Sequence, residues 1–331
     1  MIRILPFCFF PLLLLSVGVF AQDLHYSQFY HNPLHLNPAQ AGVFRGDLRA
    51  AASYRSQWTS VPVPYQTFAG TVDWKSLKRD LNLLSLGLQV QHDQAGDAAL
   101  KWTQLGAIGA VTHALGAAQA LSAGVGLTFV QRSFDISRLK FKNQWTGDVF
   151  DGSLPSGENF DKNSGIVPSL SAGLNWHFEP EETRTRLDAG LGGFHLNRPA
   201  INFRDDAGRR QPVRLALLLN GALQVGAMTD VVAFASAQRM GKARENVLGG
   251  GLRRVLNDDA AVQLTLAIRT GDALIPAFQV EWKNWTAGLS YDWNNSGFDT
   301  ATNGRGGFEI AVVYRTLPVP PAKAFKSCPI F

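Results

Sequence analysis

The sequence predicts an all-β protein. We expect a transmembrane antiparallel β-barrel of about fourteen strands, with an N-terminal extended segment packed at the periplasmic mouth. Three observations support this fold class. Apolar and polar residues alternate in runs of about ten residues, the length of a tilted strand that crosses a bilayer. Short and long connections follow one another in turn, and tryptophans stand near the ends of the runs.

Residues 1–21 have the organisation of a signal peptide. Arg3 supplies the positive charge, Ile4 to Leu15 form the apolar stretch, and Val19-Phe20-Ala21 is a small-x-small cleavage site. The apolar stretch is shorter than the roughly 20 residues of a spanning helix. We therefore expect export, cleavage after Ala21 and residence in the outer membrane.

Residues 22–46 are expected to form an N-terminal periplasmic segment. Asn32-Pro33 and Asn37-Pro38 favour extended and turn conformations over helix. The segment precedes the first strand, so it should lie on the periplasmic side. Its aromatic residues are too apolar for a free tail, so we expect it to pack into the lower barrel mouth and to narrow the lumen. The residues expected to hold it or to contact a partner are Tyr26, Phe29, Tyr30, Asn32, Pro33, Asn37, Pro38, Arg55, Gln57 and Trp58.

Residues 47–316 are expected to form the barrel, and residues 317–331 a C-terminal tail. In the first strand, from Asp47 to Trp58, the apolar residues occupy one face and Arg49, Ser53, Arg55 and Gln57 the other. The last strand, Gly307 to Arg315, should pair with the first, because an open sheet edge is too costly in lipid. Clear alternation also marks residues 84–91, 121–129, 170–178, 262–269 and 285–293; residues 99–112, 231–240 and 245–256 alternate less regularly.

Two tests distinguish a membrane barrel from a soluble sandwich with the same alternation. With both termini in the periplasm, the even-numbered connections should be tight and the odd-numbered ones longer. The even ones include 75–80, 228–230, 257–259 and 283–284, and the longest odd ones are 134–165, 198–212 and 294–306. Tryptophans favour the headgroup level. On this topology Trp74, Trp176, Trp282 and Trp285 fall at periplasmic strand ends, and Trp58, Trp102 and Trp293 at outer ends.

The sequence offers no catalytic site, metal site or cofactor site. His25, His31 and His35 match no compact zinc arrangement, and hydrogen-bonded structural histidines are the better interpretation. Glycine pairs such as Gly124-x-Gly126 lack the context of a phosphate-binding loop and fit small residues on the lumen side of strands. Without the leader, the chain has 30 basic and 26 acidic side chains. The net charge of +4 is too small to indicate that the protein binds nucleic acid. We predict that the protein is not an enzyme.

Two exposed segments and one thiol leave alternatives open. The run from Glu179 to Arg186 is either a solvated periplasmic turn or a docking patch. The loop 134–165 mixes aromatic and polar residues, and it either recognises another protein or folds over the barrel mouth. Cys328 is the only cysteine beyond the leader, so no intrachain disulfide can form in the mature chain. The sequence does not assign this thiol a role.

Several motifs resemble the PorP/SprF family of outer-membrane proteins associated with type IX secretion. The run QD-x2-YSQFY-x-NPL-x-LNPA-x-AG from Gln22, followed by YR-x-QW from Tyr54, is similar to the opening of that family. A second piece, Gly192 to Pro199 (GGFHLNRP), resembles its mid-barrel H-L-N-x-P element, which adds His195, Asn197 and Pro199 to the expected structural or partner-binding residues. The tail Cys328 to Phe331 resembles its C-P-x-F ending.

The resemblance implies a role beside the type IX secretion and gliding machinery. The partners it implies are outer-membrane lipid, periplasmic type IX components or a peptidoglycan-binding protein, and secreted adhesin-type cargo. The sequence therefore suggests a non-enzymatic adaptor for secretion or surface anchoring. The alternative is an outer-membrane porin or small-solute channel, and the N-terminal segment distinguishes the two because a simple porin does not need it.

Overall fold

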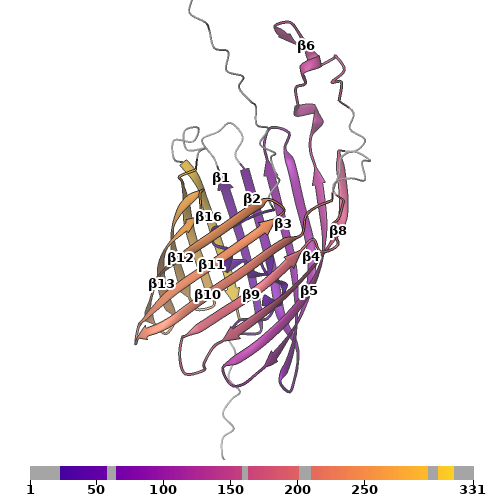
Figure 1. Ribbon diagram of the computed structural model, residues 1–331. Helices are drawn as coiled ribbons and strands as arrows, with labels where there is room; N and C mark the ends of the chain where they lie inside the picture. Colours follow the sequence, from indigo (N-terminus) through magenta and orange to yellow (C-terminus); the bar gives the residue numbers. More distant parts are fainter. Residues whose placement is uncertain (1–22, 58–64, 159–162, 201–209, 297–304, 317–331) are drawn as a thin grey trace, which may run out of the picture.

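The chain closes into a single antiparallel β-barrel (Figure 1). The structure is a computed structural model that describes residues 23–57, 65–158, 163–200, 210–296 and 305–316. Fourteen strands form the ring in sequence order, and β1 pairs with β16 to close it. The predicted fold class is thereby confirmed. Among the described residues, no helix has the length and apolar character needed to cross a membrane.

The barrel strands are 9 to 15 residues long. Their bounds are β1 Leu48–Gln57, β2 Tyr65–Arg79, β3 Asn82–Ala95, β4 Leu100–Ala114, β5 Gln119–Ser133, β8 Ser164–Phe178, β9 Arg186–Phe194, β10 Arg214–Gly226, β11 Thr229–Met240, β12 Ala243–Asn257, β13 Ala260–Arg269, β14 Ala273–Trp282, β15 Trp285–Asn294 and β16 Arg305–Arg315. We call the end at which β1 begins and β16 ends the terminal end, and the opposite end, which carries the long connections, the loop end.

The alternation of the sequence becomes an outer and an inner face. In β5, Leu121, Val125 and Phe129 point outward and are exposed, whereas Ser122 and Thr128 between them point inward and are buried. The same pattern runs through β16, where Ile310 and Val312 are exposed and Ala311 is 1% exposed. Because successive side chains of a strand point to opposite faces, this confirms the predicted register of the clearly alternating runs.

The closing pair is the predicted one. The register of β1 against β16 runs from Arg49 opposite Arg315 to Gln57 opposite Gly307. Thr316 secures the base of this seam, because its hydroxyl oxygen accepts hydrogen bonds from the backbone N–H groups of Asp47 and Leu48. No strand edge is left open at the junction, as a barrel in lipid requires.

The long connection after β5 carries its own small structure. It contains η4 (Ile136–Arg138), η5 (Lys142–Gln144) and a hairpin of β6 (Trp145–Thr146) and β7 (Val149–Phe150). It stands above the rim next to β5 and β8 (Figure 1). Trp145 packs against Phe150 with ring centroids 5.7 Å apart, so part of the aromatic content of this loop is used within the loop itself.

The expected tryptophan girdles hold for most positions but not for Trp102. Trp282, Trp285 and Trp293 are at least half exposed on the outer face. Trp102 instead points into the barrel, is 8% exposed and lies under the Arg132 guanidinium, 3.8 Å from its ring centroid. Trp102 and Gln104 are two residues apart in β4, so their side chains point to the same, inward face of the strand. Trp58 lies outside the described residues.

Candidate functional site: the lumen segment and its contacts

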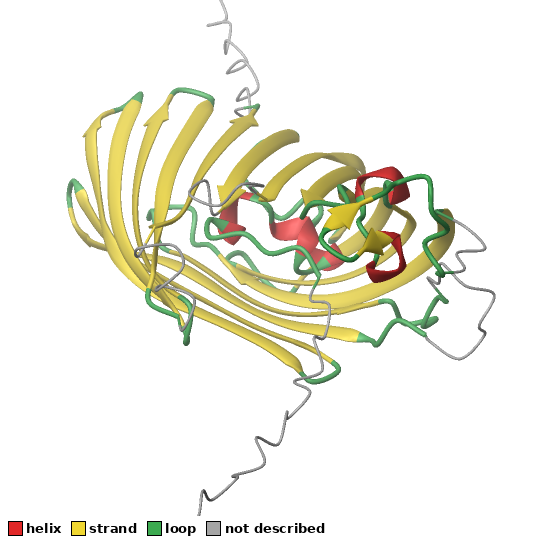
Figure 2. Ribbon diagram, turned by 90° about the horizontal axis from the view of Figure 1, so that it is seen from above, coloured by secondary structure: helices red, strands yellow, loops and turns green. Residues whose placement is uncertain are grey.

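Residues 23–46, which we call the lumen segment, run through the inside of the barrel from one end to the other. The segment contains three short helical turns, and helical turns are seen within the ring of strands from above (Figure 2). Asp23 bonds to His195 and Arg214 at the loop end. Arg45 bonds to Glu179 at the terminal end. The sequence analysis placed the whole segment at the periplasmic mouth, but only its last residues lie at the terminal end. Chain order shows where the segment must end, next to the first strand, and does not show where in the barrel it begins.

The prolines of the segment start 3-10 turns. Pro33 begins η2 (Pro33–His35), and Pro38 begins η3 (Pro38–Gln40), after η1 (Phe29–His31). Proline suits this position because its fixed φ is preorganised and its missing N–H is not needed there. The segment is therefore a chain of tight turns rather than an extended strand.

Asn37 fixes η3 to the barrel wall. Its side-chain oxygen accepts a hydrogen bond from the Ala39 N–H at 2.9 Å, and its amide nitrogen donates to the Leu174 carbonyl at 2.8 Å. Asn37 thus makes hydrogen bonds of the kind expected for it. Asn32 is also buried, but its side-chain atoms have no hydrogen-bond partner among the described residues. Within the described part of the chain, its backbone alone is bonded: the Asn32 carbonyl accepts a bond from the His35 N–H, and the Asn32 N–H donates to the Phe29 carbonyl.

Lumen-facing glycines provide the seat for η3. A Cβ atom at Gly124 of β5 would lie 2.6 Å from the backbone of Pro38 and Ala39. Added Cβ atoms at Gly173 of β8 and Gly190 of β9 would overlap the Asn37 side chain, and one at Gly192 would overlap the Leu36 carbonyl. Glycine is required at these positions because segment and wall touch backbone to backbone.

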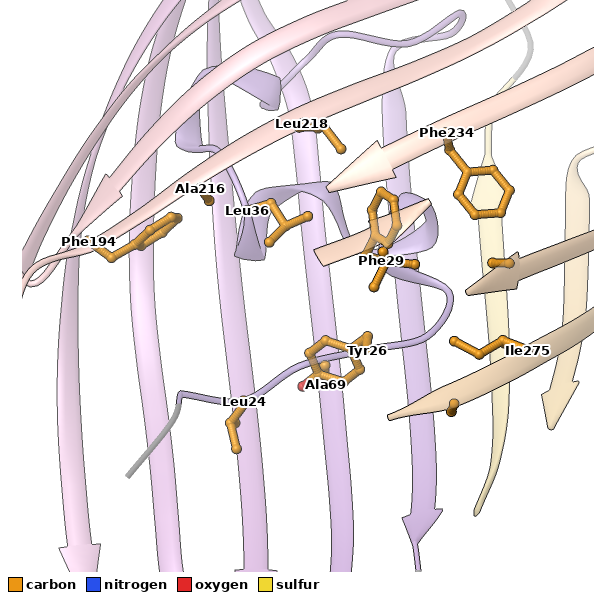
Figure 3. Close-up of a cluster of buried hydrophobic side chains, with 13 residues drawn as sticks. Leu24, Tyr26, Phe29, Leu36, Ala69, Phe194, Ala216, Leu218, Phe234 and Ile275 are labelled. Carbon is orange, nitrogen blue, oxygen red and sulfur yellow. The ribbon is translucent and has the colours of Figure 1, made fainter. Parts of the chain in front are cut away.

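An apolar cluster surrounds the middle of the segment (Figure 3). Tyr26 and Phe29 are both 2% exposed. Phe29 packs edge-on against Phe234 of β11 with centroids 5.7 Å apart, and Tyr30 lies 4.8 Å from the same ring. Tyr26 packs against His35 at 5.3 Å. These aromatic residues, expected at the lower mouth, pack inside the barrel.

Buried charges hold the start of the segment. The Asp23 carboxylate forms an ion pair with Arg214, whose Nε lies 3.1 Å away, and it lies 3.2 Å from the His195 Nε2. These side chains are at most 4% exposed. Burial raises the pKa of Asp23, but Arg214 and His195 lower it more, and the pKa stays below its usual range. Asp23 is thus a buried anion that requires both partners.

A second charged cluster holds residues 25–28. Arg55 donates to Asp292 at 2.6 Å and to the His25 carbonyl at 2.8 Å. Glu309 accepts hydrogen bonds from the backbone N–H groups of Ser27 and Gln28, at 2.7 and 2.9 Å. Arg55 therefore bonds the segment directly. Gln57 lines a loop-end cavity of about 310 Å³ beside Asp23 and His25, and within the described residues it shows no side-chain bond to the segment.

A third cluster holds the exit of the segment. Arg49 forms a two-pronged pair with Asp73, at 2.9 and 2.8 Å, and also donates to the Gln40 carbonyl at 3.0 Å. Asp73 accepts the Gly42 N–H at 2.8 Å. Gly42 has φ +76°, a left-handed conformation that favours glycine. Each level of the lumen thus has its own ionic attachment.

The element around His195 joins the segment to an unpaired edge of β8. His195 and Arg198 adopt left-handed φ values of +56° and +47°, which turn the chain sharply after β9. The Asn197 side chain then accepts the Leu170 N–H at 3.0 Å and donates to the Pro168 carbonyl at 2.8 Å. It replaces a missing strand partner there, and Pro199 is buried at the end of the turn. His195 and Asn197 therefore make contacts that hold this turn and the segment in place.

A charged cavity of about 310 Å³ lies inside the barrel at the terminal end. Tyr30 and His31 of the segment lie along its wall. The five arginines that line it are Arg45, Arg184, Arg186, Arg253 and Arg315, and its acidic lining residues are Glu179, Asp230 and Glu281. Within the described part of the chain, Arg315 is the lining arginine without an ion pair. The cavity therefore presents an excess of positive charge.

Sequence reasoning missed most of these attachments. The sequence analysis did not single out five charged residues that stand at inward positions of strands or in the segment itself: Asp23, Asp73, Arg214, Asp292 and Glu309. A charge on the buried face of a strand needs a partner. The available signal was therefore a charged residue at a position where the alternation of the strand points inward. His25, His31 and His35 hold no metal arrangement: the described residues contain no group of three or more potential metal ligands.

Comparison with known proteins agrees with this architecture. Residues 18–314 match the family described as type IX secretion system membrane protein PorP/SprF. The chain belongs to the PorP/SprF family. This confirms the resemblance seen in the sequence motifs, and the family and the barrel fold together support an outer-membrane location for this PorP/SprF barrel. No curated protein sequence matches the chain.

Solved structures show the same fold at low identity. The Ralstonia pickettii toluene transporter TbuX has a TM-score of 0.51 and 9% identity over 87% of this chain and 94% of that one. The P. putida toluene transporter TodX has a TM-score of 0.50 and 12% identity over 87% and 95% of the two chains. At such identities the likeness concerns the barrel alone. Family and fold are of a secretion-machinery or channel kind.

Proposed function

We propose that this PorP/SprF barrel is a plugged, non-enzymatic adaptor of the type IX secretion machinery. Its terminal end would face the periplasm and bind a type IX component or a peptidoglycan-binding protein. Its cargo would be an adhesin-type protein that is secreted or anchored at the surface, including in gliding. The observation that carries the proposal is the lumen segment, which fills the barrel and is attached at three levels by buried charges.

An open pore does not need such an arrangement. Burying a charge costs several kcal/mol unless a partner compensates it. Asp23, Asp292 and Asp73 each have an arginine partner, and each of these clusters also bonds the segment. Cleavage after Ala21 is consistent with this, since Asp23, two residues later, is buried within the lumen.

The terminal-end cavity is the surface we assign to the periplasmic partner. The segment contributes Tyr30 and His31 to its lining, which also includes Arg45 and Glu179. A partner bound there would contact the segment and the wall together. The turn at residues 179–186 borders this cavity. The two interpretations of this turn, a solvated turn and a docking patch, are therefore compatible.

A channel for small solutes is the second candidate. Separate cavities of about 310 Å³ lie at the loop end and at the terminal end. The structural neighbours TbuX and TodX are titled toluene transporters. A channel function for this chain would require the segment to move aside and connect the two cavities.

Partner capture tests the adaptor proposal. We expect Arg45→Glu, which reverses a half-exposed charge on the rim, to reduce cross-linking to an identified type IX component and display of the adhesin. Arg254→Glu is the matched control, since this arginine lies on the outer face of β12. Both proteins should insert and fold, as judged by migration of the unheated barrel on electrophoresis. Unchanged capture and display with Arg45→Glu and with deletion of residues 23–44 would reject the adaptor.

A further inference from the structure

The outer face of the barrel contains a long apolar hollow. Its volume is about 1,230 Å³ and it crosses the strands from β3 to β12. The register shows two adjacent rows of outward side chains that follow the hydrogen-bond direction across the wall. One row is Leu84, Val111, Ala123, Leu174, Leu191, Leu217, Ala237 and Asn246, and the other is Gly109, Val125, Ala172, Gly193, Leu215, Arg239 and Arg244.

Small residues create the hollow. Gly109, Ala123, Ala172, Gly193 and Ala237 all lie in the two rows. A Cβ atom at Gly109 would have nothing within 4 Å, so the space in front of it is open. Seven steps between neighbouring strands, at about 4.8 Å each, make the hollow about 34 Å long. That length suits extended acyl chains better than a compact solute.

The hollow ends at a pair of arginines at the loop end. Arg239 of β11 and Arg244 of β12 stand directly opposite each other and are both exposed. Like charges in this position are destabilising. Among the described residues neither forms an ion pair, and Arg239 donates only a long bond of 3.4 Å to the Gly241 carbonyl. Glu245, next in sequence to Arg244, faces the lumen and bonds to Gln238, so it does not neutralise the pair.

We propose that this face binds a phosphate-bearing, multi-chain lipid of the outer leaflet, of the lipid A class. The phosphate would lie between Arg239 and Arg244, since guanidinium groups recognise phosphate through paired N–H donors. The acyl chains would lie along the apolar rows. An outer-leaflet lipid is the occupant because the arginines are at the loop end, which carries the long connections, and barrels of this kind carry their longer loops outside the cell. This site does not depend on the adaptor proposal, since it lies on the opposite face of the wall from the lumen segment.

Lipid retention by the purified barrel tests the site. The barrel is titrated with lipid A in detergent, and bound lipid is counted by native mass spectrometry. The double variant Arg239→Gln/Arg244→Gln should weaken lipid A binding by about tenfold or more, as expected for two basic residues that contact an anionic headgroup. Gly109→Phe should also weaken it by filling the hollow. Matched controls are Arg254→Gln, an outward arginine at the other end of β12, and Ala287→Phe, an outward alanine of β15 outside the hollow.

The controls make the test specific. Weaker lipid A binding in the arginine and Gly109 variants, with both controls unchanged, supports the site. Equal binding in all variants overturns it. Two further results overturn it as well: phosphatidylglycerol that binds as tightly as lipid A, or inorganic phosphate that displaces lipid A at millimolar concentration. Loss of binding in Arg254→Gln to the same extent would show a general charge effect and reject the site.

Discussion

Gly124→Val should unseat η3 while leaving the barrel wall intact. The new side chain would meet the backbone of Pro38 and Ala39, whose nearest atoms lie 2.6 Å from the Cβ position. Overpacking of this kind costs about 1–3 kcal/mol. Displacement also breaks the Asn37 to Leu174 and Gln40 to Asn175 hydrogen bonds, worth about 1 kcal/mol each. We expect the seat of η3 to lose about 3 kcal/mol.

Cysteine labelling measures this loss. Ala39 is completely buried, so Ala39→Cys in a Cys328→Ser background reacts with a maleimide only when η3 leaves its seat. A loss of about 3 kcal/mol raises the exposed population, and hence the labelling rate, about 100-fold. The matched control is Gly109→Val, on the outer face of the neighbouring strand β4, where the added atoms have open space. Labelling that is unchanged in Gly124→Val, or equally accelerated in Gly109→Val, would refute this account of the seat.

Three further predictions concern the wall, the turn and pH. Val312→Arg places a charge on the lipid face of β16 and should lower the free energy of unfolding by about 2–4 kcal/mol if it lies near the bilayer midplane; an unchanged urea midpoint in vesicles would show that the face is misassigned. Asn197→Ala removes both bonds to the edge of β8, so amide exchange at Leu170 should accelerate, whereas exchange at Ala172, which pairs with β9, should not. Burial and then Arg214 lower the pKa of His35 to about 3, against about 6.5 in an exposed histidine. The seated segment therefore binds fewer protons than the released one, and its stability falls as pH drops from about 6.5 towards 3, by about 2 kcal/mol at pH 5. Amide exchange of residues 33–40, corrected for its intrinsic pH dependence, should show this loss, and His35→Gln should reduce it; exchange that is independent of pH would contradict the assignment.

The sequence predicts the wall of the barrel well because the physical signal is local. Alternation with period two places the Ile310 side chain on the outer face and the Ala311 side chain on the inner face. A register shift of one residue would turn the polar face of the strand towards the lipid, so the register is strongly specified. The pairing of the first and last strands follows from the cost of an open edge. Family motifs identified Arg55, Asn37 and His195, which all contact the segment or its seat.

The path of the lumen segment is not a local property. Asp23 meets Arg214 across 191 positions of sequence, and Arg55 meets Asp292 across 237. No pattern of period two or 3.6 encodes such pairs. Lumen-facing glycines such as Gly124 and Gly173 gave a partial signal, since small inward residues leave room for something inside. The sequence analysis placed the segment only at the lower mouth of the barrel and did not predict that it runs through the whole lumen.

Conductance in a planar bilayer tests the central claim most directly. The claim is that residues 23–46 close the lumen between the cavities at its two ends. We predict that the intact mature barrel inserts without steady single-channel steps, and that the same barrel lacking residues 23–44 inserts equally well and conducts. Steady conductance of the intact barrel that the deletion leaves unchanged would contradict a closed lumen and favour the channel.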